Sequence, residues 1–113
     1  MHLNFNFFRD RAIVNVDAQS VTVNFTHWER KRKSFSLRWE DVNAIKAVQL
    51  EPAIMALVFC TDQELRWSIS EDMENWSALL DMVHRNCQGF DWITFEETKG
   101  HINKSLLCWK RTG

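Results

Sequence analysis

The chain has 113 residues, of which 45% are hydrophobic and 26% charged, a balance typical of a globular domain rather than a disordered or fibrous one. The length suits a single α+β domain over residues 1–113 with one core. The sequence shows neither an apolar run of about 18 residues nor a basic segment followed by an apolar one, so we expect no membrane span, no signal peptide and a cytoplasmic location.

Charge is distributed unevenly along the chain, although the formal net charge is only −1. Residues 1–38 carry seven Lys or Arg against three Asp or Glu, residues 39–100 carry four against twelve, and residues 101–113 carry three against none. This distribution predicts a dipolar surface, with an acidic middle segment and basic ends.

The first part of the chain has the pattern of several strands. Residues 3–8 predict a strand or an arm that packs by its aromatic side chains. A strand at 12–16 and the turn-forming residues 17–20 lead into residues 21–27, where apolar and polar residues alternate. The alternation returns at residues 35–39, so we expect a hairpin whose tip is the charged loop 28–33.

Three further strands are expected before the first helix. Residues 44–51 have no decisive period, and we interpret them as a strand with a helical turn possible at its start. Residues 54–60 form a continuous apolar run, which is typical of a strand buried on both faces. Residues 65–69 alternate again and predict the next strand.

The strongest helix signal lies between Ser70 and Gly89. The Ser70 hydroxyl suits an N-cap, and acidic residues at 71, 72 and 74 would complement the positive end of the helix dipole. Gly89 suits the left-handed conformation that closes a helix. At helical spacing, one face would carry the apolar side chains Met73, Trp76, Leu79, Leu80 and Val83. We therefore expect one long helix here.

A short second helix over residues 90–99, ended by Gly100, and a closing strand over residues 105–110 complete the expected elements. The predicted fold is α+β: a curved antiparallel sheet of about seven strands, packed by the long helix in the C-terminal half of the chain. This arrangement looks like the pleckstrin-homology superfold, a likeness of architecture that implies no function by itself.

The densest charge cluster is the basic loop of Arg30, Lys31, Arg32 and Lys33, which follows Trp28. Four adjacent cations beside an aromatic ring suit phosphate, on nucleic acid or on an anionic lipid headgroup. The simpler interpretation, which we favour, is a solvated hairpin tip that discourages association between strand edges.

Cysteines and histidines give little support to a metal site. Cys60, Cys87 and Cys108 are odd in number and lack the CxxC spacing of a zinc knuckle, and they fit reduced thiols. His84 and Cys87 are three residues apart, but zinc needs three or four ligands. We expect no metal and no other cofactor. The sequence also lacks a glycine-rich phosphate loop and a Ser–His–Asp signature, so we expect no enzyme.

Acidic residues of the middle segment form the other candidate surface. Helix-dipole complementarity explains several of them, yet together they suit a protein-binding face with Trp92 or Phe95 as its apolar anchor. The predicted acidic residues of this face are Glu71, Glu74, Asp81, Asp91, Glu96 and Glu97.

Three stretches resemble a broad group of small bacterial proteins, most of them uncharacterised. These stretches are residues 67–76 with the letters WSISEDMENW, residues 89–111 from Gly-Phe-Asp to Trp109-Lys110-Arg111, and residues 36–45. Some proteins of this kind resemble immunity proteins of polymorphic-toxin and contact-dependent inhibition systems.

That resemblance implies a non-enzymatic protein that binds and neutralises a cognate toxin. The alternative is a pleckstrin-homology-like module that binds anionic lipid headgroups or nucleic acid through residues 30–33. A third possibility is a structural or regulatory domain with an unidentified partner.

Overall fold

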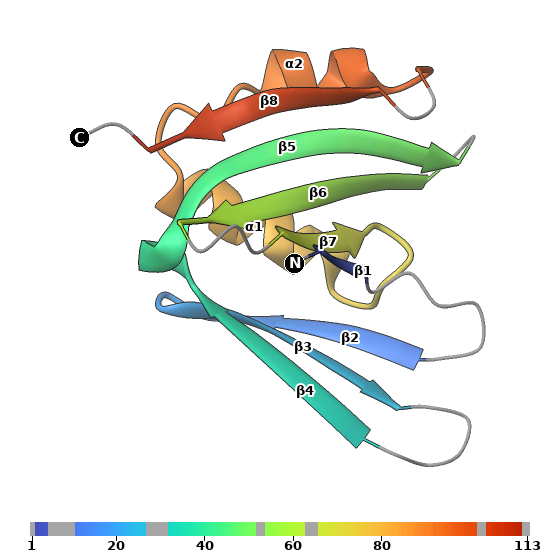
Figure 1. Cartoon of the computed structure of the whole chain (residues 1–113), viewed down its shortest axis with the longest axis vertical. Coiled ribbons are helices and arrows are strands. Elements are labelled where there is room, and N and C mark those ends of the chain that lie inside the picture. The colour runs from blue at the N-terminus through green and yellow to red at the C-terminus, as the bar shows by residue number, and fades with distance from the viewer. Residues whose placement is uncertain are drawn as a thin grey trace.

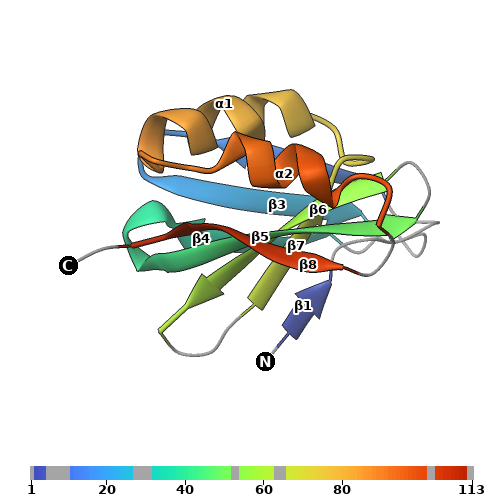
Figure 2. The same cartoon turned by 90° about the horizontal axis from the view of Figure 1, so that it is seen from above.

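The computed structural model describes residues 2–4, 11–26, 32–51, 54–62, 66–101 and 104–111. Its strands form two sheets, and its two α-helices lie on one side of them, behind the sheets in Figure 1 and above them in Figure 2. The small sheet has the order β2 (Arg11–Val16), β3 (Ser20–Thr26), β4 (Arg32–Arg38). The large sheet has the order β1 (His2–Asn4), β7 (Arg66–Ser70), β6 (Ile54–Thr61), β5 (Val42–Glu51), β8 (Ser105–Lys110). The helices are α1 (Trp76–Asn86) and α2 (Trp92–Thr98).

The small sheet is an antiparallel meander whose first turn is stabilised by Asp17. The Asp17 carboxylate accepts the backbone N–H groups of Gln19 and Ser20, each at 2.7 Å. These hydrogen bonds favour the ionised form and hold the pKa of Asp17 below its ordinary value, the bond from Gln19 most strongly. The predicted turn at residues 17–20 is confirmed. The hydrogen bonds of the Asp17 side chain stabilise it without the glycine that many tight turns contain.

The predicted single curved antiparallel sheet is wrong. In the described part of the chain, eight strands form two separate sheets, and β1 lies parallel to β7. The separation occurs at η1 (Trp39–Asp41), a single 3₁₀ turn between β4 and β5. The Trp39 ring is buried against Phe59, with 6.1 Å between ring centroids, and its indole N–H donates to the carbonyl of Asp17 at 2.9 Å. The chain therefore turns a corner here, and β5 joins a new sheet.

The predicted long helix is also wrong. Residues before Trp76 form backbone hydrogen bonds with neighbouring strands instead of with a helical turn. The N–H of Glu71 donates to the carbonyl of Met55 at 2.9 Å. The N–H of Glu74 donates to the carbonyl of Ala12, and the carbonyl of Glu74 accepts the N–H of Val14. Ser70 belongs to β7 and its hydroxyl donates to Asp72, so it caps no helix. The helix starts only after Asn75, which lies in the left-handed region with φ 69°.

Two glycines follow the helices in the left-handed conformation. Gly89 has φ +84°, as predicted, but α1 ends at Asn86 with Cys87 as its C-cap, so Gly89 lies in the turn after the helix and does not close it. α2 lies within the predicted second helix at residues 90–99, and Gly100, with φ +89°, follows its end. The architecture is thus α+β with two short helices of 11 and 7 residues rather than a single long one. The analogy with the pleckstrin-homology superfold depended on the single sheet and the long helix.

One hydrophobic core joins the two sheets and the helices. Fully buried side chains come from the small sheet (Val14, Val21, Val23), the large sheet (Ile45, Leu57, Phe59, Ile69) and α1 (Leu79, Val83). The predicted burial of the 54–60 run on both faces is confirmed, because Met55 to Phe59 are all buried. No helix in the described ranges has the length and apolar character needed to cross a membrane.

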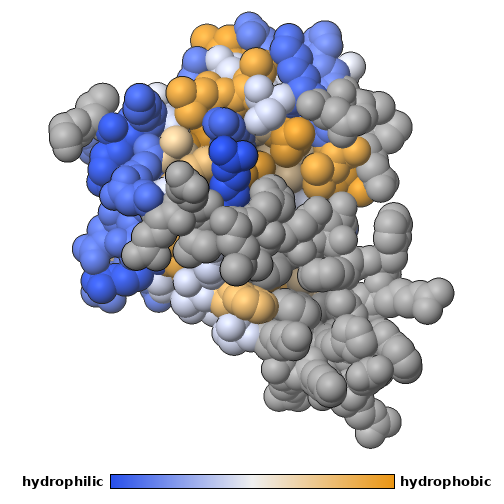
Figure 3. Space-filling model, viewed as in Figure 1, coloured by the Kyte–Doolittle hydropathy of each residue, from blue (hydrophilic) through white to orange (hydrophobic). Residues whose placement is uncertain are grey.

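Successive residues of β5 lie alternately on the two faces of the large sheet, one facing the helices and the other facing away from them. Ile45, Ala47 and Gln49 of β5 are buried, and the Gln49 amide oxygen accepts the N–H of Gly100 at the end of α2, so this set faces the helices. Lys46 lies on the other face between Val58 and Leu107, its neighbours across the strands. Figure 3 shows hydrophobic surface over the β5–β8 region of that face. The Leu107 side chain there is 49% exposed.

Candidate functional site

The six predicted acidic residues lie on three parts of the chain: the β7–α1 connection, α1 and α2. Glu71 lies before α1, where its carboxylate accepts the backbone N–H of Met55 at 2.7 Å. Glu74 also lies before α1, and its backbone bridges to Ile13 of β2. Both residues fasten the β7–α1 connection to neighbouring strands. The Glu71 carboxylate is thus used in a structural contact, whereas the Glu74 side chain is exposed, and neither residue lies in the first turn of α1.

Asp91 serves as the N-cap of α2. Its carboxylate accepts the backbone N–H of Thr94 at 3.0 Å and the Thr94 hydroxyl at 2.6 Å. These bonds hold the pKa of Asp91 below its ordinary value, and the hydroxyl contributes most to the shift. Its charge thus stabilises the start of a helix, the position where a capping carboxylate is most favourable.

The other three acidic residues lie on the outer surfaces of the helices. Asp81 is exposed on α1 between the buried Leu79 and Val83, and Glu96 and Glu97 are exposed on α2. Figure 2 shows the two helices side by side. They meet where His84, one turn after Asp81, lies 6.2 Å from the Trp92 ring between centroids. The Glu96 carboxylate also pairs with Lys99 at 3.0 Å, with both side chains at least half exposed.

The two aromatic side chains predicted as anchors differ in their environment. Phe95 is only 4% exposed and belongs to the core, so it is wrong as an anchor. Trp92 is partly exposed and packs on Phe90, with 4.4 Å between ring centroids. A partner protein could therefore contact the exposed part of Trp92 but not Phe95.

Ile93 is the apolar residue that sequence reasoning missed. Its side chain is 74% exposed. Glu96 and Glu97 follow it by three and four residues, so all three lie on the same side of α2. The signal was present in the sequence: if Phe95 faces the core, a residue two positions away is rotated by about 200° and faces outward. We refer to Asp81, Trp92, Ile93, Glu96 and Glu97 as the helix-pair face.

Among the described residues, the two most exposed large apolar side chains lie on different faces of the molecule. Ile93 lies on α2, on the helix side of the large sheet, whereas Leu107 shares the opposite face with Lys46. The helix-pair face thus combines one highly exposed apolar side chain, Ile93, with the three exposed carboxylates of Asp81, Glu96 and Glu97.

Most of the basic loop lies outside the described residues. Trp28, Arg30 and Lys31 lie outside them, and Arg32 and Lys33 are described only by their backbone, as the first residues of β4.

The cysteines show packing rather than reactivity. Burial raises the pKa of Cys87 to about 11, against the opposing charge of Arg111, and burial raises the pKa of Cys108 to about 11. Both side chains therefore stay protonated near neutral pH, which disfavours a nucleophilic role. Across the described ranges, no group of three or more His, Cys, Asp and Glu side chains is placed to hold a metal ion.

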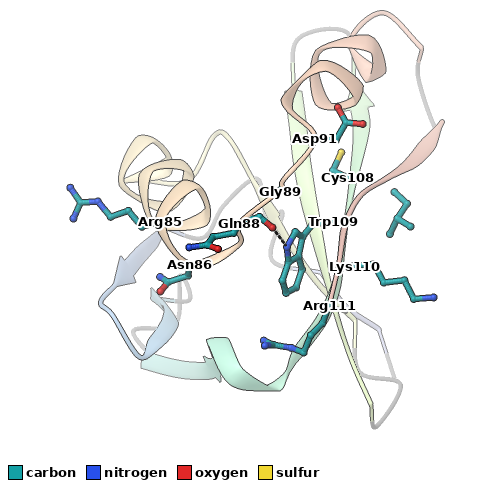
Figure 4. Close-up of a pocket in the computed structure, with 10 residues that line it drawn as sticks. Arg85, Asn86, Gln88, Gly89, Asp91, Cys108, Trp109, Lys110 and Arg111 are labelled. Carbon is teal, nitrogen blue, oxygen red and sulfur yellow. Dashed lines mark hydrogen bonds between the residues drawn. The ribbon is translucent and has the colours of Figure 1, made fainter. Parts of the chain in front are cut away.

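The end of β8 borders a recess that the sequence did not predict. It has a volume of about 630 Å³ and lies between the C-terminal end of α1 and β8 (Figure 4). The Trp109 indole N–H donates to the carbonyl of Gln88 at 3.0 Å and so joins the two segments. A second recess of about 340 Å³ shares Asn86 and Arg111 with the first. The Trp-x-Arg motif at 109–111 was the available signal, although the sequence offered only a structural role for it.

Comparisons of this chain with protein-family models, with curated proteins and with solved structures found no match.

Proposed function

We propose that this protein is a non-enzymatic binding domain that captures a protein partner on its helix-pair face and acts as an immunity protein against a bacterial toxin domain. The observation that carries the binding role is the 74% exposure of Ile93 beside Glu96 and Glu97. The immunity role comes from the sequence resemblance described above. Protection by this route requires only that the toxin be occluded.

The charges of the helix-pair face favour a basic partner. Glu97 and Asp81 are exposed. Glu96 forms an ion pair with the exposed Lys99, and surface pairs of this kind contribute little to stability. Complementary charges raise association rates, whereas a few buried apolar anchors slow dissociation. Glu96 and Glu97 should therefore control capture, and Ile93 should control the lifetime of the complex.

The test of function is co-expression with the product of a neighbouring gene. Cells that produce only the neighbouring gene product should die, and cells that produce it together with this protein should survive. Equal death in both cases would remove the immunity proposal. Pull-down of the neighbour without protection would keep the binding role and reject neutralisation.

The test of the face uses charge reversal with a matched control. Glu96→Lys with Glu97→Lys should slow association by roughly 10-fold or more at low salt and change dissociation less. Glu40→Lys with Asp41→Lys makes the same change of net charge at η1, which lies at the other end of β5 from the α2 terminus that contacts Gln49. Equal effects of the two double variants would show that only net charge matters.

Ile93→Ala tests the anchor. Because the side chain is 74% exposed, its truncation should change the free energy of unfolding by no more than about 0.5 kcal/mol. A contribution of about 1–2 kcal/mol to binding would accelerate dissociation by roughly 5- to 30-fold. Unchanged dissociation, measured by surface plasmon resonance, would place the contact elsewhere.

A further inference from the structure

Arg111, at the end of β8, is held by three independent contacts. Its Nε–H donates to the carbonyl of Val42 at 3.0 Å, and its Nη2–H donates to the carbonyl of Trp39 at 2.8 Å. The guanidinium carbon lies 5.3 Å from the centroid of the Trp109 ring. A flexible cationic side chain is thus oriented before any ligand arrives, which reduces the entropy lost on binding.

These contacts leave one edge of the guanidinium available. Nε and Nη2 form the side edge of the fork, which the two carbonyls occupy, whereas the end edge, formed by Nη1 and Nη2, has further N–H donors. Carbonyl oxygens carry no net charge, and within the described ranges no carboxylate pairs with Arg111. The end edge therefore presents a full positive charge in the planar geometry that matches carboxylate and phosphate oxygens.

A second donor lines the same recess as Arg111. Asn86, the last residue of α1, lines the same 340 Å³ recess, and its side-chain amide forms no hydrogen bond in the described part of the chain. Figure 4 shows Asn86 at the end of α1 and Arg111 beyond the end of β8, and the Lys110 side chain points away from both. Arg38 and Glu40, which also line the recess, pair with each other at 2.9 Å. Their charges compensate, so Arg111 supplies the net charge of the recess.

We propose that Arg111 and Asn86 form a binding site for the carboxylate or phosphate group of a small polar ligand. The volume of about 340 Å³ is near the lower end of small-molecule sites, and polar side chains form most of the wall, which suits a short ligand. The site lies on elements other than the charged turn of α2, so it stands independently of the proposed toxin binding.

The simpler role for Arg111 is structural, because it ties β8 to η1. The test therefore changes Asn86 first. Asn86→Asp keeps both carbonyl contacts of Arg111 but places a negative charge in the recess, and its exposed position at the end of α1 should make the cost to folding small. Asn24→Asp makes the same chemical change on β3 as the control. Arg111→Lys keeps the charge and removes the fork.

The experiment is an NMR titration at constant ionic strength with inorganic phosphate and, separately, with succinate. We expect saturable shifts of the Asn86 amide and Arg111 Nε–H signals, retained in Asn24→Asp and weakened by roughly 10- to 100-fold in Asn86→Asp and in folded Arg111→Lys. Saturation by phosphate alone or by succinate alone supports the site and identifies the ligand group. Linear shifts spread over exposed cations, or equal binding by wild type and Asn86→Asp, would overturn the proposal.

Discussion

At the scale of single residues, Asp91 couples its ionisation to the start of α2. The Thr94 hydroxyl contributes most to lowering the pKa of Asp91 in the folded state. The ionised carboxylate therefore contributes fully to stability above the ordinary carboxyl pKa of about 4. This contribution is lost as the pH falls through the lower pKa of the folded state. Asp91→Asn keeps an acceptor but no charge. The variant should be less stable than wild type at pH 7, and the difference in urea midpoint should shrink in acid. Parallel curves for the two proteins would contradict this assignment.

A second variant separates the hydroxyl from the backbone donor at this cap. Thr94→Val removes the 2.6 Å hydroxyl bond to Asp91 and leaves the N–H bond in place. Its urea midpoint should therefore depend on acid pH less steeply than that of wild type and more steeply than that of Asp91→Asn.

Trp76, on the predicted apolar stripe of α1, is less buried than Leu79. It packs against the core but stays partly exposed, whereas Leu79, one turn later, is 0% exposed. We expect Trp76→Ala to cost about 1–3 kcal/mol and Leu79→Ala about 2–5 kcal/mol, measured by denaturant melts. A cost below about 0.5 kcal/mol for Trp76→Ala would mean that its indole contributes no packing.

At the scale of elements, α1 depends on the left-handed conformation of Asn75. Its φ of 69° lets the chain leave the bridge at Glu74 and enter the helix within one residue. Glycine adopts this conformation freely, but alanine pays about 1–2 kcal/mol. Asn75→Gly should therefore be more stable than Asn75→Ala by about 1 kcal/mol in urea melts. Equal midpoints would argue against a left-handed residue at this position.

At the scale of the whole molecule, the shared core predicts that the two sheets unfold together. Val14, Val21 and Val23 of the small sheet pack in one cluster with Leu57 of β6 and with α1. Leu57→Ala should lower stability by about 2–5 kcal/mol and accelerate amide hydrogen exchange in β3 as strongly as in β6. Faster exchange confined to β6 would show that the small sheet is an independent folding unit.

The strands were largely predictable because their signals are local. The alternation at 21–27 and the apolar run at 54–60 reflect one buried face and two buried faces, and β3 and β6 lie there. Part of the candidate site was predictable in the same way, since Asp81, Glu96 and Glu97 are exposed on the helices. The anchor was not, because Phe95 and Ile93 are both apolar and only the packing of α2 decides which one faces the core.

The sequence by itself determined the α+β composition, most strand positions, the turn at Asp17 and the left-handed glycines after the helices, because neighbouring residues set these features through hydrogen bonds and backbone freedom. Only the tertiary structure decided which strands pair and where α1 begins. Glu71 bonds to Met55 and Glu74 to Ala12, and these distant partners outcompete a helical turn that Ser70 could have capped. Asn86 is likewise far in sequence from Val42 and Trp39, whose carbonyls orient Arg111, so the recess that Asn86 and Arg111 share exists only in the folded chain.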